Sequence, residues 1–265
     1  MAQSHILIGA PTRLDHLSIR RVGTAHLIDA LKKGWQDFSA MPSHALFLCV
    51  MYPVIGILVA GLTLGYALLP WFYPLAAGFA LIGPVAAIGL YELSRRREAG
   101  IEVAAADALD VLHSPSIGAI VALSLLLMLL FLIWVATAHA IYVASFGYAT
   151  PSSIGQFARD VLTTQAGWYL IVIGNGVGFL FAVAALVVSV VSFPLLLDRD
   201  VGAAVALATS ARAVLENPAA MALWGLIVAV LLLLGSLPMF LGLPVVLPVL
   251  GHATWHLYRR LVAPV

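Results

Sequence analysis

Four long stretches of this 265-residue chain contain no Asp, Glu, Lys or Arg, and this pattern restricts the possible folds more than any other feature. The stretches cover residues 38–91, 111–158, 161–197 and 217–258. A helix needs about 20 apolar residues to cross the hydrocarbon core of a membrane. The first and last stretches are long enough for two helices joined by a short turn, and each middle stretch holds one helix. The pattern predicts an all-α, polytopic membrane protein with six transmembrane helices.

The composition supports this class. Apolar residues make up 63% of the chain and charged residues only 9%, whereas a soluble domain carries about 25% charged residues. We expect the six helices to form three hairpins. They are predicted near residues 45–68, 74–95, 117–145, 168–193, 219–237 and 239–258.

The distribution of basic residues predicts the orientation, because Lys and Arg accumulate on the cytoplasmic side of a membrane protein. With a cytoplasmic N-terminus, only Arg159 falls on the opposite side. Both termini are therefore expected to be cytoplasmic. The first 40 residues are mixed and polar and contain no signal peptide, so we expect the first helix to direct insertion and to remain in the protein.

Three amphipathic segments, at residues 25–38, 101–112 and 201–215, precede Pro42, Pro115 and Pro218 and are expected to lie in the cytoplasmic interface. Residues 74–96 also align with residues 238–260, including matched prolines and a shared Arg-Arg end. The first and third hairpins are therefore predicted to be a parallel repeat. We expect a tail at residues 1–23 and one domain at 24–265, which comprises repeat 1 (24–98), a middle hairpin (99–198) and repeat 2 (199–265).

Three parts of the chain resemble a known family: residues 20–47, the segment IGPVAAIGLYELSRR that ends at Arg96, and the C-terminal segment LGLPVVLPVLGHATWHLYRRLV. These resemble an uncharacterised family of bacterial integral membrane proteins, domain of unknown function 2189, over nearly the whole chain. The resemblance implies a protein of the bacterial cytoplasmic (inner) membrane with no established activity. Some relatives carry the label cytochrome oxidase subunit I, which the sparse histidines of this sequence do not support.

The first candidate site is a polar position in the fourth predicted helix. Asn175 stands between Gly174 and Gly176, and His139 of the third helix is expected at a similar depth. Glycine destabilises a helix by about 1 kcal/mol relative to alanine, so this stretch could open into a solute site. The simpler interpretation, which we favour, is that the glycines allow close helix packing and that Asn175 bonds to a neighbour.

The second candidate site is the end of the last predicted helix together with the matching end of the first repeat. It comprises His252, His256, Arg259, Arg260, Arg95 and Arg96. His252 and His256 are four residues apart and share a helix face, so they could bind a metal or haem. An interfacial anchor for an anionic lipid headgroup is the favoured interpretation, because these residue types commonly hold helix ends at the membrane surface.

No catalytic motif is present, and no ionisable residue is predicted at mid-membrane depth, which disfavours a proton-driven carrier. We expect a non-enzymatic accessory or scaffold protein without a cofactor or assigned metal site. Its expected partners are the lipid bilayer, other membrane proteins or anionic lipids. The net charge of +1 disfavours nucleic acid. A small permease or channel for a neutral or amphipathic solute, and a haem- or metal-binding respiratory accessory, remain alternatives.

Overall fold

The computed structural model describes residues 17–41, 56, 69–148, 151–237 and 241–263. Within these ranges the chain is helical apart from turns and loops, and the one extended pairing joins Ile19 to Val262. The chain forms two compact units. Unit 1 contains Met1–Pro53, Pro84–Leu125 and Leu186–Val265, and unit 2 contains Val54–Gly83 and Leu126–Ala185. Each unit is described by itself.

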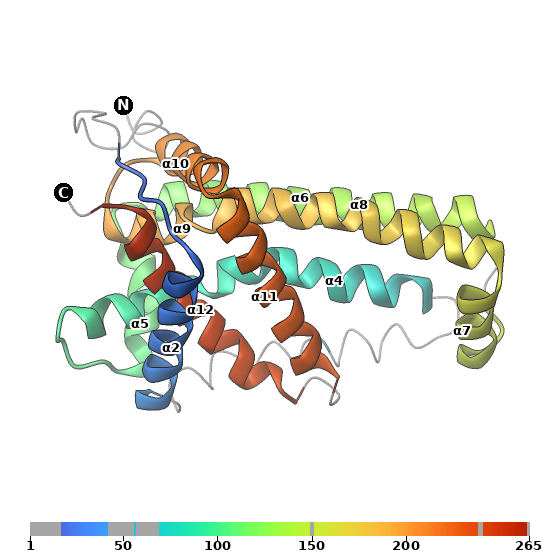
Figure 1. Cartoon of the computed structure of the whole chain (residues 1–265), viewed down its shortest axis with the longest axis horizontal. Helices are drawn as coiled ribbons and strands as arrows, with labels where there is room; N and C mark the ends of the chain where they lie inside the picture. Colours follow the sequence, from blue (N-terminus) through green and yellow to red (C-terminus); the bar gives the residue numbers. More distant parts are fainter. Residues whose placement is uncertain (1–16, 42–55, 57–68, 149–150, 238–240, 264–265) are drawn as a thin grey trace. The chain divides into compact units, whose positions relative to one another are not determined.

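Unit 1 is built around α2 and α12, which lie side by side (Figure 1). Leu27 and Ala30 of α2 are fully buried. Backbone hydrogen bonds between the two chain ends, from Arg20 N to Leu261 O at 2.7 Å and from Ala263 N to Ser18 O at 3.2 Å, extend this pairing. The helices of unit 1 are α2 (Thr24–Ala40), α5 (Ile88–Glu98), the 3₁₀ helix η2 (Ala105–His113), α9 (Ser192–Asp198), α10 (Ala203–Glu216), α11 (Pro218–Ser236) and α12 (Leu243–Leu261).

Gly34 permits the close approach of α2 and α12. A Cβ atom on Gly34 would lie 2.6 Å from the carbonyl oxygen of Val249 and 2.7 Å from the Cβ atom of Ala253. The backbone of one helix therefore rests directly on the other. This contact places the C-terminal half of α12 against α2.

Unit 2 is organised around Trp134, whose side chain is 3% exposed. Its indole N–H donates to the carbonyl of Pro74 at 2.8 Å. Gly78 and Gly178 lie against the same indole, because a Cβ atom on either would come within 3.0 Å of the ring. The helices are α4 (Leu69–Ala86, to residue 83 in this unit), α6 (Ile117–Phe146, from residue 126), α7 (Ile154–Thr163) and α8 (Gln165–Ser189, to residue 185).

Helix α7 was not predicted from the sequence. Ser153 caps its N-terminus by accepting a hydrogen bond from the backbone N–H of Gln156. The turn into α8 requires a glycine at Gly167, where a Cβ atom would meet the carbonyl oxygens of Asp160 and Val161.

Three helices are long and apolar enough to cross a membrane among the described residues: Ile117–Phe146, Gln165–Asp198 and Pro218–Ser236. The predicted helices at 117–145 and 219–237 agree closely with α6 and α11. The span predicted at 168–193 corresponds to α8 and the start of α9, and the one predicted at 239–258 overlaps α12. The span predicted at 45–68 lies outside the described residues. The six-span count, the hairpins and the repeat stay predictions.

Two predicted segments differ in detail from the observed elements. The span predicted at 74–95 is divided into α4 and α5 at Ala87. Pro84 lies three residues before this division, and a proline has no N–H for the helical ladder. The interfacial segment predicted at 101–112 is the short helix η2, whereas those predicted at 25–38 and 201–215 agree with α2 and α10.

We predict that Gly34→Ala destabilises the protein by about 1–3 kcal/mol, because the added methyl group overpacks the contact with α12. Helix propensity alone would favour alanine by about 1 kcal/mol, so the sign of the effect distinguishes packing from propensity. Thermal unfolding in lipid nanodiscs measures it. Gly23→Ala is the control, since a Cβ atom there meets nothing within 4 Å. An equal or higher unfolding temperature for Gly34→Ala would contradict the close contact.

Candidate functional site

A buried polar cluster joins α2, α5 and α12 in unit 1. We call it the Asp37 cluster, and it consists of Asp37, Ser94, Arg97, His252 and His256. The Ser94 hydroxyl donates to Asp37 Oδ2 at 2.7 Å, and Arg97 Nη1 donates to Asp37 Oδ1 at 2.8 Å. His256 Nε2 lies 2.8 Å from Asp37 Oδ2. Ser94 and His252 are fully buried and Asp37 is 6% exposed.

The two histidines share one face of α12, as their spacing predicts, but they have different partners. His252 Nδ1 lies 2.7 Å from Ser94 Oγ, whereas His256 bonds to Asp37. The single proton of the Ser94 hydroxyl goes to Asp37, so the hydroxyl oxygen accepts the Nδ1–H of His252. His252 Nε2 is buried without a geometric hydrogen-bond partner among the described residues, and the His252 ring also interacts with the backbone of Leu90.

Asp37 is held in its charged form. Burial by itself would raise the pKa of this carboxyl group, but the hydrogen bonds from His256 and Ser94 outweigh burial and lower the pKa below the ordinary value of 3.8. A carboxylate that accepts three hydrogen bonds is well compensated inside a protein.

The arginines of the second candidate site all pair with carboxylates of the same chain. Glu92, which is 3% exposed, accepts from Arg95 at 2.7 Å and from Arg96 at 2.9 Å. Arg96 continues to η2, where it lies 3.1 Å from Asp107 and also pairs with Asp110.

The arginines at the end of α12 follow the same rule. Arg259 lies 3.2 Å from Glu98 and 3.5 Å from Asp198, and Arg260 lies 2.8 Å from Asp29. Each of the six residues of this site therefore has a partner within unit 1, but the bonds place them in separate groups around Asp37, Glu92, Glu98 with Asp198, and Asp29. Binding of a lipid headgroup by them stays a prediction.

The Asp37 cluster contains the residue types of acid–base catalysis, but its geometry is that of a polar core. Ser94 Oγ is inaccessible, because the side chain is completely buried. Its proton is donated to Asp37 and not to a histidine base. In the part of the chain that the structure describes, no group of three or more His, Cys, Asp and Glu side chains could hold a metal ion.

The first candidate site lies in unit 2 and is only partly assembled as predicted. Asn175 accepts a hydrogen bond from the Tyr73 hydroxyl at 2.7 Å and donates one to the carbonyl of Ile171 at 2.7 Å. His139 instead stacks on Trp71, with ring centroids 4.3 Å apart. Helix α8 continues through the glycines without opening. Gly174 lines a cavity, but Gly176 does not.

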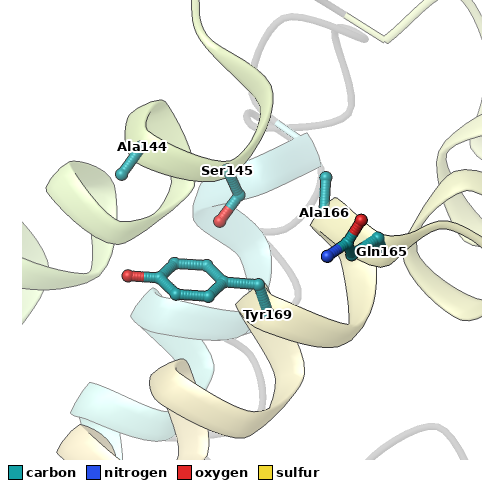
Figure 2. A pocket seen from close by; sticks show the side chains of 5 residues that line it. All are labelled: Ala144, Ser145, Gln165, Ala166 and Tyr169. Atoms are coloured by element: carbon teal, nitrogen blue, oxygen red, sulfur yellow. The ribbon is translucent and has the colours of Figure 1, made fainter.

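That cavity has a volume of about 260 Å³, is partly open, and is lined by residues of four helices. Its lining residues are Pro70, Tyr73, Pro74, Trp134, Ala138, Ile141, Tyr142, Phe157, Val161, Leu170, Ile171, Gly174 and Asn175. A second depression, about 350 Å³ in volume and wide open, lies where α6 ends and α8 begins. Figure 2 shows its five lining residues, with the Tyr169 ring pointing across toward α6.

Sequence reasoning missed Asp37, Ser94 and Tyr73 as site residues. Asp37 and Ser94 are 57 positions apart, and Asp37 and His256 are 219 apart. One available signal was that Asp37 is the last charged residue before a long uncharged stretch. Tyr73 lies one residue before the span predicted at 74–95 and belongs to no recognisable motif.

The family comparison gives the chain its class. Residues 72–198 match the model of the family described as "Predicted integral membrane protein (DUF2189)". This match confirms the resemblance to domain of unknown function 2189. It includes residues 82–96, one of the three segments that carried the resemblance. The chain is thus an integral membrane protein of unknown function. No curated protein and no solved structure matches it.

We predict that Asp37→Asn destabilises unit 1 by about 2 kcal/mol, because the buried carboxylate accepts three hydrogen bonds and its replacement leaves a buried donor unsatisfied. Thermal unfolding in nanodiscs measures the change. Asp29→Asn is the matched control: it also breaks an Asp–Arg pair of α2, but at an exposed position where such pairs contribute about 1 kcal/mol or less. Similar losses for the two variants would refute the special role of Asp37.

The lowered pKa of Asp37 also predicts a pH dependence. The unfolded chain binds the proton more readily than the folded protein, so the contribution of Asp37 is present above its ordinary pKa of 3.8 and is lost as the pH falls through the folded pKa. Denaturant midpoints of the native protein and Asp37→Asn, taken from about pH 6 to about pH 3, test this. We expect the difference to shrink below about pH 4. A constant difference would contradict the charged state of Asp37.

Proposed function

We propose that the protein is a non-enzymatic accessory or scaffold protein that packs with other proteins or lipids in the bacterial cytoplasmic membrane. The observation that carries this proposal is the Asp37 cluster. The serine, carboxylate and histidines that could perform chemistry in unit 1 are bonded to one another and buried. They hold three helices together, which is a structural use of these groups.

The surface of unit 1 supports the same proposal. Each of its amphipathic helices exposes large apolar side chains: Trp35 of α2 is 54% exposed, Leu112 of η2 is 64% exposed and Leu215 of α10 is 76% exposed. Exposed apolar side chains on such helices favour attachment to a membrane interface or to a partner protein. The arginines of α5 and of the end of α12 are paired within the chain, which leaves them less free to recognise an ionic substrate.

We propose a topology with both termini on the cytoplasmic side and six spans. The described part of unit 1 supports this arrangement, because hydrogen bonds join the short segments that flank the ends of different helices. Segments that bond to one another in this way lie on the same side of the membrane. Ser116, before α6, donates to Asp200, after α9, at 3.4 Å. Asn217, before α11, bonds to Arg20 and Val22 of the N-terminal segment. Most Lys and Arg residues also lie in this unit, which fits the positive-inside rule.

A small permease for a neutral or amphipathic solute is the second candidate, and the cavity beside Asn175 favours it. Haem or metal binding has less support, because His252 Nδ1 and His256 Nε2 already bond to Ser94 and Asp37.

Photo-crosslinking in living cells tests the scaffold proposal. A photoreactive phenylalanine analogue would replace Trp35 or, as a control, Val172, which is 63% exposed on α8 in unit 2. We expect position 35 to give one discrete adduct with another membrane protein or with lipid, which mass spectrometry would identify, because a scaffold holds a fixed neighbour. If the photoreactive group at position 35 reacted only with water and formed no adduct, this result would contradict the proposal.

A further inference from the structure

The cavity of unit 2 has an apolar, strongly aromatic wall without any charged residue. Its lining includes Tyr73, Trp134, Tyr142 and Phe157. Ligand sites of this kind bind molecules mainly by burying apolar surface, with a few polar groups to fix orientation. The uncharged lining excludes ions and charged solutes as good ligands, because the cavity offers them no compensating charge.

The wall of this cavity is preformed. Trp134 is fixed by its hydrogen bond to the Pro74 carbonyl and by its contacts with Gly78 and Gly178. The Phe181 ring packs against it at a centroid distance of 5.6 Å. A rigid aromatic wall binds a ligand without first having to be ordered. At about 260 Å³ the cavity exceeds the roughly 150 Å³ that suffices to bind benzene in an apolar protein interior.

Helix α7 covers one end of the cavity. Phe157 and Val161 of α7 belong to the lining, and the Phe157 ring lies 6.4 Å from that of Tyr142. Arg159 on the same helix is exposed. Tyr148 and Trp168, at the neighbouring ends of α6 and α8, are 86% and 55% exposed. Aromatic side chains at helix ends mark the membrane–water interface, so α7 lies at headgroup level and the cavity extends from there into the hydrocarbon region.

Asn175 is the polar group of the cavity lining beside Tyr73, and its side chain is exposed. Asn175 is ten residues after Gln165, the first residue of α8, which places it about 15 Å along the helix. One Nδ2 hydrogen bonds to the Ile171 carbonyl, and Oδ1 accepts from Tyr73. Among the described residues, the second Nδ2 hydrogen has no acceptor. An unpaired amide hydrogen in hydrocarbon is unfavourable, and a ligand oxygen would satisfy it.

We propose that this cavity binds a neutral, lipid-soluble molecule that carries one hydrogen-bonding oxygen, such as a long-chain alcohol. The apolar body lies between Trp134, Tyr142 and Phe157, and the oxygen accepts the free hydrogen of Asn175. This inference goes beyond the scaffold proposal and does not depend on it, since it concerns different residues in a different unit.

Two glycines of α8 provide a matched pair of variants for the test. A Cβ atom added at Gly174 or at Gly176 would meet nothing within 4 Å, so both positions have open space beside the helix. Gly174 lines the cavity and Gly176 does not. Gly174→Leu therefore fills space that the ligand needs, and Gly176→Leu makes the same chemical change outside it.

The probe is decan-1-ol that carries an alkyl diazirine, added to the full-length protein in nanodiscs and activated by light. We expect saturable labelling of the lining residues of α6, α7 and α8, identified by peptide mass spectrometry. Gly174→Leu should lower the labelling about tenfold, because it displaces roughly two methylene groups of ligand. Gly176→Leu should label as the native protein does. Circular dichroism checks that both variants are folded.

Two competition experiments complete the test. Unlabelled decan-1-ol should compete about tenfold better than decane, because only the alcohol satisfies Asn175. Equal competition would refute the hydrogen-bonded oxygen. Labelling that does not saturate, or that is equal in both glycine variants, would show general lipid exposure and overturn the proposal. Displacement of the probe by phospholipid but not by decan-1-ol would assign the cavity to a bilayer lipid and overturn it as well.

Discussion

The carboxylate of Asp37 connects three helices that are distant in sequence, and the arrangement of unit 1 depends on it. It accepts hydrogen bonds from Ser94 and Arg97 of α5 and from His256 of α12, while its own backbone belongs to α2. A buried charge is tolerated only when it is paired and hydrogen-bonded. The requirement to satisfy this one group therefore fixes the positions of the three helices more specifically than apolar packing alone would.

The same requirement explains why so many charges of unit 1 are paired within the chain. Arg95 pairs with Glu92 of its own helix, whereas the other arginines of α5 and those of α12 each pair with a carboxylate on a neighbouring helix. Exposed ion pairs add little to stability, but a network that includes the buried Glu92 specifies which helices are neighbours. A rigid assembly with apolar side chains on its outer helices suits a protein whose proposed role is to hold others in place.

The sequence predicts the long apolar helices of the described residues well, because twenty or more uncharged residues have few alternatives to a membrane helix. Helices α6 and α11 illustrate this. It predicts neither α7, which is a short helix between two spans, nor the division between α4 and α5. The sites are harder still. The spacing of His252 and His256 indicates a shared face, but their partners Ser94 and Asp37 come from other helices. Likewise, Asn175 is visible as a polar residue among apolar ones, whereas its bond to Tyr73 and the cavity beside it exist only after three-dimensional packing.

A double-mutant cycle between Asp37 and His256 tests the central claim most directly. Unfolding free energies of the native protein, Asp37→Asn, His256→Gln and the double variant would be measured in lipid bicelles. A cluster that locks α2 to α12 predicts a coupling energy of about 1–3 kcal/mol. Additivity within about 0.3–0.5 kcal/mol would mean that the two side chains do not act together, and it would contradict the structural role assigned to the Asp37 cluster.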